Sequence, residues 1–251
     1  MNAIGSDTVL SAFVLFCRIG ACLMLMPGFS SPRIPTMVRL FLAVAITLAF
    51  VPLLGPNVEK VIDKAAPFTL LRVIVTESLI GGMIGFMGQI FFAGLETLGT
   101  AIAQEIGLSN ALGVPINESE PLPTVASLLT FLATTLLFVT NLHWEILRGI
   151  VASYRALPIT GGFSAQFGLI EIVDTLGKAF LLSLRIASPF IVFAIIVNLG
   201  IGLANRLTPQ IPVYFIVAPF VVFGGLVLFY FTFRQLLEVF MAGFSAWLTN
   251  G

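Results

Sequence analysis

Four charged side chains stand within or beside strongly apolar stretches of this 251-residue sequence, and they are its first candidates for chemistry. They are Arg18, Glu77, Arg185 and Arg206. A charge at the centre of a membrane helix costs about 2.5–3.5 kcal/mol on insertion scales, so we expect each to be buried against a partner. Glu77 fits either an ion or proton site or a pair with an arginine of a neighbouring helix. The arginines hold their charge at any physiological pH, which favours a structural clamp over a proton relay.

The remaining reactive residue types form no catalytic pattern. His143 is the only histidine, and no Cys, Asp or second His stands at ligand spacing from it, which argues against a metal site. Cys17 and Cys22 share one apolar segment and are interpreted as small buried hydrophobic residues. The sequence has no P-loop, dinucleotide fingerprint or G-x-S-x-G motif. We therefore expect no enzyme: no catalytic residue, no cofactor and no metal.

The composition places these residues in a membrane protein. Hydrophobic residues make up 58% of the chain and charged residues 10%, whereas a soluble domain carries about 25% charged residues. No Lys or Arg lies between Arg72 and Arg148, and no basic cluster occurs elsewhere that could neutralise phosphates. Nucleic acid is therefore excluded as a partner, and an integral membrane protein is the expected class, in contact with membrane lipid.

The apolar residues fall into segments long enough to be membrane helices. None of the segments shows the alternating pattern of a membrane β-barrel, so the expected fold is all-α, built from apolar helices that proline interrupts. The basic residues are divided between both possible sides, so the sequence leaves the membrane orientation open. The six expected helices lie near 8–29, 36–54, 68–95, 121–144, 179–204 and 211–233.

The third segment carries a stripe of small residues. Glu77, Gly81, Gly85 and Gly88 recur at helical spacing and so share one face of the expected helix. Glycine lets the backbone of a second helix approach closely, which is how membrane helices associate. We therefore predict that the three glycines form a helix-packing face.

A polar, acidic segment with several Gly, Pro and Asn residues separates two of the long helices, at 103–123. One interpretation is an ordinary exposed connection. The other is a functional loop, because a connection of this length is unusual inside a compact protein. Its candidate residues are Glu105, Gly107, Asn110, Gly113, Pro115 and Asn117.

Four stretches in sequence order resemble the FliR/SctT family of type III secretion subunits, whose members serve flagellar biosynthesis and virulence secretion. They are "FCRIGACLMLMPGFSSPRIPTMVRLFLAVAITL", "ESLIGGMIGF", "LLFVTNLHWEILRGIVASYRALPI" and "LRIASPFIVFAIIVNLGIGLANRLTPQIPVYFIVAPF". The chain departs from the family in two places. It has "VPINESEP" where many relatives carry Asp-Pro, and Asn141-Leu142-His143 where many have Asn-Gly-His.

The resemblance implies a non-catalytic subunit of the flagellar protein export gate, in the bacterial inner membrane at the flagellar basal body. Its implied partners are FliP, FliQ and FlhB homologues in a multi-subunit helical assembly of hairpins, with exported flagellar proteins passing through a central conduit. It also implies a FliP-like part at 1–178 and a FliQ-like part at 179–251. Arg206 would then lie at a bend between two helices packed against other subunits. On this basis we predict that the loop at 104–122 is a plug across the conduit.

Two other functions stay open on the sequence alone. A small-molecule or ion permease would use Glu77, Arg185 and Asn198 to bind its substrate midway across the bilayer. Carriers often contain internal repeats with matching broken helices, and the last two segments have no clear twin in the first three. A scaffold for an assembly factor, without any conduit, is the third possibility.

Overall fold

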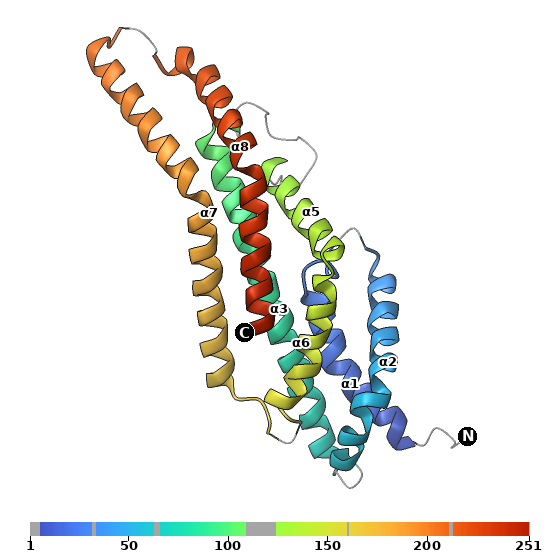
Figure 1. Cartoon of the computed structure of the whole chain (residues 1–251). Coiled ribbons are helices and arrows are strands. Elements are labelled where there is room, and N and C mark those ends of the chain that lie inside the picture. The colour runs from blue at the N-terminus through green and yellow to red at the C-terminus, as the bar shows by residue number, and fades with distance from the viewer. Residues whose placement is uncertain are drawn as a thin grey trace. The chain divides into compact units, whose positions relative to one another are not determined.

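The computed structural model is all-helical in the residues that it describes, which are 6–31, 34–62, 66–108, 124–159, 161–210 and 213–250. The helices are α1 (Ser6–Leu25), α2 (Thr36–Ile62), α3 (Pro67–Glu105), α5 (Thr124–Val139), α6 (Leu142–Ala156), α7 (Ala165–Leu207) and α8 (Val213–Asn250) (Figure 1). The expected fold class is confirmed, although several helices run well beyond the apolar segments that predicted them.

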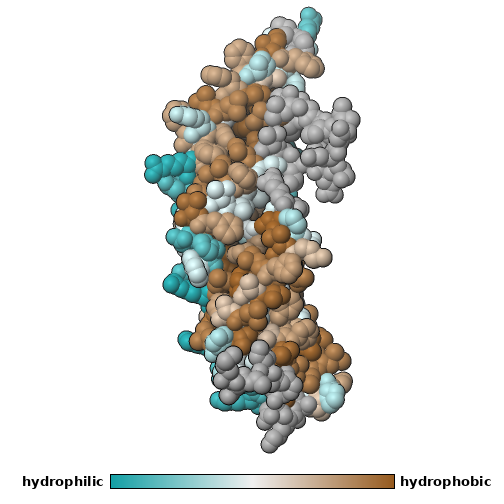
Figure 2. Space-filling model, turned by 90° about the vertical axis from the view of Figure 1, so that its right-hand side faces the viewer, coloured by the Kyte–Doolittle hydropathy of each residue, from teal (hydrophilic) through white to brown (hydrophobic). Residues whose placement is uncertain are grey.

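Five of these helices are long and apolar enough to cross a membrane, or six if α5 and α6, which a short break separates, count as one span. The longest, α7, has 43 residues and is therefore about 65 Å long, twice the roughly 30 Å of a bilayer core. Apolar side chains cover most of the face drawn in Figure 2.

Proline interrupts the helices less than expected. Pro52 and Pro56 lie inside α2, Pro189 inside α7 and Pro219 inside α8. A proline removes one backbone hydrogen bond and strains the preceding turn, but membrane helices tolerate this where neighbours re-satisfy the freed groups. The prediction that the second helix ends near residue 54 is therefore wrong, because α2 continues to Ile62.

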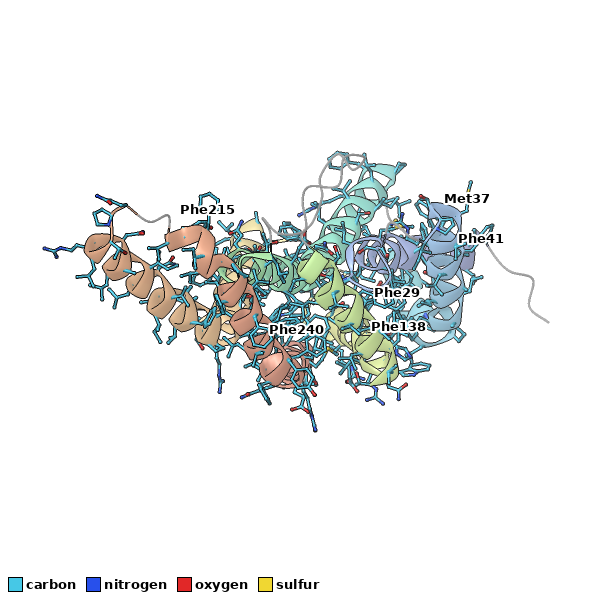
Figure 3. All side chains as sticks on the ribbon, turned by 90° about the horizontal axis from the view of Figure 1, so that it is seen from above. Phe29, Met37, Phe41, Phe138, Phe215 and Phe240 are labelled. Carbon is cyan, nitrogen blue, oxygen red and sulfur yellow. The ribbon has the colours of Figure 1, made fainter. Side chains whose placement is uncertain are left out.

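The chain forms two compact units, and each is described by itself. The first unit comprises residues 1–91, 137–177 and 248–251. Its central element is α1, which contacts α2 and α3. Val14, Leu15 and Ile19 of α1 are completely buried. Phe29 and Phe138 of this unit make an edge-to-face contact, with 5.6 Å between ring centroids (Figure 3).

The second unit comprises residues 92–136 and 178–247. The carboxyl-terminal part of α3 is its core, with Phe92 packed edge-to-face on Phe240 and Phe244 of α8 at 5.4 and 5.6 Å. Helices α7 and α8 run antiparallel and form a hairpin (Figure 1), with Phe190 of α7 beside Phe229 of α8.

Candidate functional site: the buried arginine cluster and the end of α3

The glycine stripe of α3 lies directly against α1. A Cβ atom at Gly81 would overlap the backbone of Arg18, and one at Gly85 would lie 2.5 Å from the carbonyl oxygen of Cys22. At Gly88 a Cβ would lie 2.5 Å from the sulfur of Met26. Backbone atoms cannot move aside as a flexible side chain can, so the first two positions accept only glycine at this helix separation. The need for this face in assembly stays a prediction.

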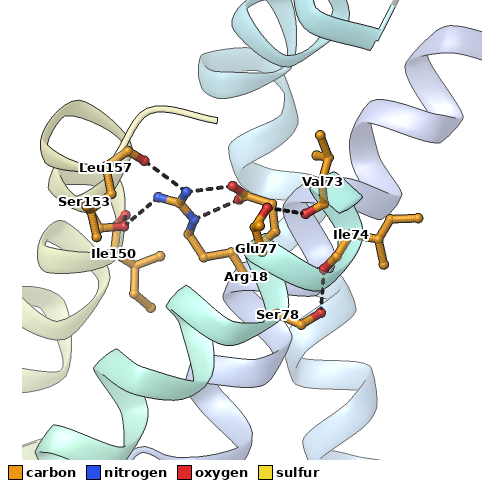
Figure 4. Close-up of polar contacts among 9 residues, drawn as sticks. Arg18, Val73, Ile74, Glu77, Ser78, Ile150, Ser153 and Leu157 are labelled. Atoms are coloured by element: carbon orange, nitrogen blue, oxygen red, sulfur yellow. Dashed lines mark hydrogen bonds and ion pairs between the residues drawn. The ribbon is translucent and has the colours of Figure 1, made fainter. Parts of the chain in front are cut away.

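The close approach of the two helices brings Arg18 of α1 to Glu77 of α3 (Figure 4). Both side chains are completely buried, at 0% exposure. Nε of Arg18 donates to Oε2 of Glu77 at 2.7 Å, and Nη2 donates to Oε1 at 2.7 Å. This two-pronged geometry is the strongest form of an arginine–carboxylate pair. It occupies both carboxylate oxygens, so Glu77 keeps little capacity to bind an ion.

Helix α6 supplies the other partners of Arg18. Nη1 donates to Oγ of Ser153 at 3.2 Å, and Nη2 donates to the carbonyl oxygen of Leu157 at 3.0 Å. The guanidinium also lies over the ring of Tyr154, 4.0 Å from its centroid. Leu157 is the C-cap of α6, where carbonyl groups lack helical partners and attract a cation. Arg18 therefore joins the end of α6 to α1 and α3.

The contacts of this cluster join three helices. A buried ion pair is costly to desolvate, and removing one partner leaves an uncompensated charge, which destabilises a protein by about 3–5 kcal/mol. Its residues include no nucleophile with a general base beside it. Nor do the described residues hold any group of three His, Cys, Asp or Glu side chains that could bind a metal. The cluster links α1, α3 and α6 through the side chain of Arg18.

The expectation that Arg185 and Arg206 are also buried does not hold within the single chain, where both are exposed. Arg206 lies in the last turn of α7 and is exposed. The α7–α8 join lies at residues 208–212, as the sequence interpretation of Arg206 required. A partner for either arginine on another subunit stays a prediction.

Two of the predicted loop residues are described. Glu105 ends α3 and is exposed, and Gly107 has a φ of +74°, a left-handed conformation that favours glycine. Between them Ile106 is completely buried, against the backbone face of Gly225 in α8. The chain directly after α3 is therefore held against α8 by Ile106. The other four predicted residues lie outside the described residues: Asn110, Gly113, Pro115 and Asn117.

A cavity of about 430 Å³ lies beside this part of the chain, between the end of α3 and the α7–α8 hairpin. Most of its wall is apolar, and its polar groups come from Gln104, Glu105, Asn198 and Tyr214. The sequence interpretation considered Asn198 only for a permease, included Gln104 only as the first residue of the predicted plug, and assigned nothing to Tyr214.

Sequence reasoning also missed Ser153, Tyr154 and the carbonyl of Leu157. No spacing rule links these residues to Arg18, since they lie 135 or more positions away. The available signal was the strongly amphipathic pattern of "LHWEILRGIVASYRA", which predicts that one face of this helix packs inward. Gly225 was missed as well, although a Gly-Gly pair inside an apolar helix suggests a close contact.

Comparison with known proteins gives a consistent result. The family model described as "Bacterial export proteins, family 1" matches residues 9–247. A protein of Caulobacter vibrioides named "Flagellar biosynthetic protein FliR" is 31% identical over 255 residues, which cover 96% of this chain and 100% of that protein.

Proteins with the same name in Escherichia coli and Bacillus subtilis also match over most of both chains. The first is 31% identical over 83% of this chain and 78% of that protein. The second is 21% identical over 87% of this chain and 84% of that protein. The resemblance inferred from the four sequence stretches is confirmed, and the chain belongs to family 1 of the bacterial export proteins.

Proposed function

We propose that this chain is a structural and gating subunit of the flagellar protein export gate and catalyses no reaction. It would assemble with FliP, FliQ and FlhB homologues in the bacterial inner membrane, at the base of the flagellum. Its helices would form part of the conduit through which flagellar proteins leave the cytoplasm. The observation that carries this proposal is the near-complete match, over residues 9–247, to a family of bacterial export proteins.

The distribution of burial supports a place among other subunits. Only 11% of the apolar window of α8 and 17% of that of α2 is buried inside the chain, against 44% for α1. Met37 and Phe41 of α2 and Phe215 of α8 project outward (Figure 3) and are 68%, 70% and 77% exposed. Such surfaces must be covered by lipid, by other helices or by both.

The buried pair disfavours the permease alternative. In a permease that used Glu77, the carboxylate would need a free oxygen for its substrate or ion. Here Arg18 occupies both oxygens, at 2.7 Å each. Arg18 cannot serve a proton-coupled carrier as a relay, because an arginine does not lose its proton at physiological pH.

Within the export gate, we propose that the loop at 104–122 closes the conduit in the resting state. Ile106, held against Gly225, would anchor the plug at its base, and Gly107 would let the chain turn away from α3. The division into a FliP-like part at 1–178 and a FliQ-like part at 179–251 stays a proposal of the same kind.

The function is tested in a strain that lacks this chain. We expect export of flagellar proteins into the medium, and motility, to be lost and to return with the wild-type gene. Purification of the tagged chain in mild detergent should yield a large complex that contains FliP and FliQ homologues. A small homo-oligomer that transports a solute in vesicles would instead establish the permease. Normal export without the chain would reject the gate role.

The plug is tested separately by deleting residues 108–118 and bridging the ends. We expect an assembled complex that leaks small ions and slows growth. A shorter deletion within the connection between α6 and α7, at 157–164, serves as the control, because no plug role is proposed for that connection. Assembled complexes that do not leak would reject the plug while leaving the gate role intact.

A further inference from the structure

A second group of polar side chains lies on the α7–α8 hairpin and has no role in the proposals above. Arg185 and Ser188 of α7 face Thr232 and Gln235 of α8 across a cavity of about 370 Å³. Its apolar wall comes from Ile186, Pro189, Leu236 and Val239. The cavity is therefore an amphipathic groove with a guanidinium at its edge.

Two of the four polar side chains of this groove are already bonded, but its strongest donor is not. The hydroxyls of Ser188 and Thr232 donate to carbonyl oxygens of their own helices at 2.8 Å. Arg234, at the same level of α8, pairs with Glu238 at 2.7 Å. Arg185 is exposed and makes no ion pair with any residue that the structure describes. An exposed guanidinium without an ion-pair partner attracts an anion.

The groove lies at one end of an uncharged layer of the hairpin. Residues 186–205 of α7 and 213–233 of α8 contain no Asp, Glu, Lys or Arg. Twenty helical residues rise about 30 Å, the thickness of a bilayer core. Arg206 ends this layer at the loop, and Arg185 and Arg234 end it on the other side.

Exposed tyrosines lie near both ends of this uncharged layer. Tyr214 stands near the loop, and Tyr230 stands one turn before Arg234, where it is 78% exposed. Tyrosine is enriched at membrane–water interfaces because its ring is apolar and its hydroxyl is polar. Large exposed apolar side chains occupy the layer between them, including Val192, Ile195, Phe220 and Phe223. Charge, aromatic position and apolar length are together those expected of a groove at the depth of lipid headgroups.

We propose that the groove binds the phosphate headgroup of an anionic phospholipid. The planar fork of Arg185 suits phosphate oxygens, the amide of Gln235 offers a second donor, and the acyl chains would lie along the exposed apolar face of the hairpin. A carboxylate on a helix of a partner subunit has the same charge but would not require the interfacial tyrosines or a full bilayer thickness of uncharged surface.

Phosphatidylglycerol binding to the full chain tests this site. The chain is purified in detergent with the subunits that accompany it, stripped of lipid and titrated with phosphatidylglycerol or phosphatidylcholine. We expect Arg185→Gln to weaken phosphatidylglycerol binding roughly fivefold, about the contribution of one basic residue near an anionic surface. Phosphatidylcholine binding should be unchanged. Inorganic phosphate should compete poorly, because it lacks acyl chains to bury.

Arg234→Gln is the matched control, since it removes an equal charge at the same level from a residue that already has a partner. An equal loss in both variants would indicate general charge attraction and overturn the site. Unchanged lipid binding in Arg185→Gln would also overturn it, and loss of a companion subunit with lipid retained would identify a partner carboxylate instead. If Arg185→Gln does not accumulate, Arg185→Lys replaces it, with a smaller loss expected because the charge remains.

Discussion

The α1–α3 pair and the α7–α8 hairpin both carry charged groups in apolar helices. Only the pair buries and neutralises such charges within the chain. In the pair, Arg18 and Glu77 neutralise each other inside the chain, and glycines bring the two helices into backbone contact. In the hairpin, Arg185 and Arg206 are exposed and most of the apolar surface is uncovered. The charges of the α1–α3 pair are satisfied within the chain. The exposed arginines and apolar surface of the hairpin need lipid or other subunits to cover them.

Helix hydrophobicity therefore does not show which helices are buried within the chain itself. The window of α8 has a mean hydropathy of 2.3 and that of α1 has 2.1, yet 11% and 44% of them are buried. What separates the two is a partner surface inside the chain. Substitutions in either region test this contrast.

The largest effect is expected for Gly81→Leu. The new side chain would collide with the backbone of Arg18, which cannot yield without separating α1 from α3. The amount of folded chain in membranes, measured by protease resistance and thermal unfolding in detergent, should fall to a small fraction of wild type. Gly200→Leu in α7 is the control, since no atom lies within 4 Å of its added Cβ. Equal levels of the two variants would contradict the packing argument.

A loss of about 3–5 kcal/mol in the free energy of unfolding is expected for Glu77→Ala, because it strands the buried charge of Arg18. The double variant Arg18→Met with Glu77→Leu should recover most of this loss, since apolar side chains of similar volume often replace a buried pair without penalty. Unfolding in detergent measures both. A double variant as unstable as the single one would show that the pair contributes more than charge balance.

A smaller loss, about 1–3 kcal/mol from overpacking, is expected for Gly225→Ala. Its methyl group would overlap Ile106 at the base of the proposed plug. Gly224→Ala is the neighbouring control, because its Cβ would meet only the ring of Phe193 at an ordinary 3.4 Å. Adding Ile106→Ala should restore part of the stability of Gly225→Ala. If Ile106→Ala restores no stability, the loss in Gly225→Ala does not come from overlap with Ile106.

The smallest effect on the chain itself is expected for Arg206→Ala. An exposed arginine without a partner among the described residues contributes within about 0.5 kcal/mol to stability, so unfolding of the isolated chain should be unchanged. The yield of the complex with FliP and FliQ homologues should nevertheless fall if another subunit binds this arginine. An unchanged complex and normal export would remove Arg206 from the assembly surface.

The sequence predicted the helical class well and the helix ends poorly. Apolar length identified the membrane-type helices, because about 20 residues must cross the bilayer core. It could not predict that α2 continues through Pro52 and Pro56, since whether a proline ends a helix depends on neighbours that re-satisfy the freed carbonyl. Helices also extend beyond their uncharged apolar segments, as α7 does from Ala165.

By itself the sequence determined the faces of its helices. The 3.6-residue period alone puts Glu77, Gly81, Gly85 and Gly88 on one side of α3, and that side is the one that contacts α1.

Only the tertiary structure decided which charges are satisfied within the chain. Arg18 meets Glu77 across 59 positions and Leu157 across 139, and local periodicity carries no information about such pairings. Arg18, Arg185 and Arg206 look alike in sequence because each stands in or beside an apolar helix. They differ because burial depends on what packs against a helix, and α6 and α3 enclose the first arginine alone.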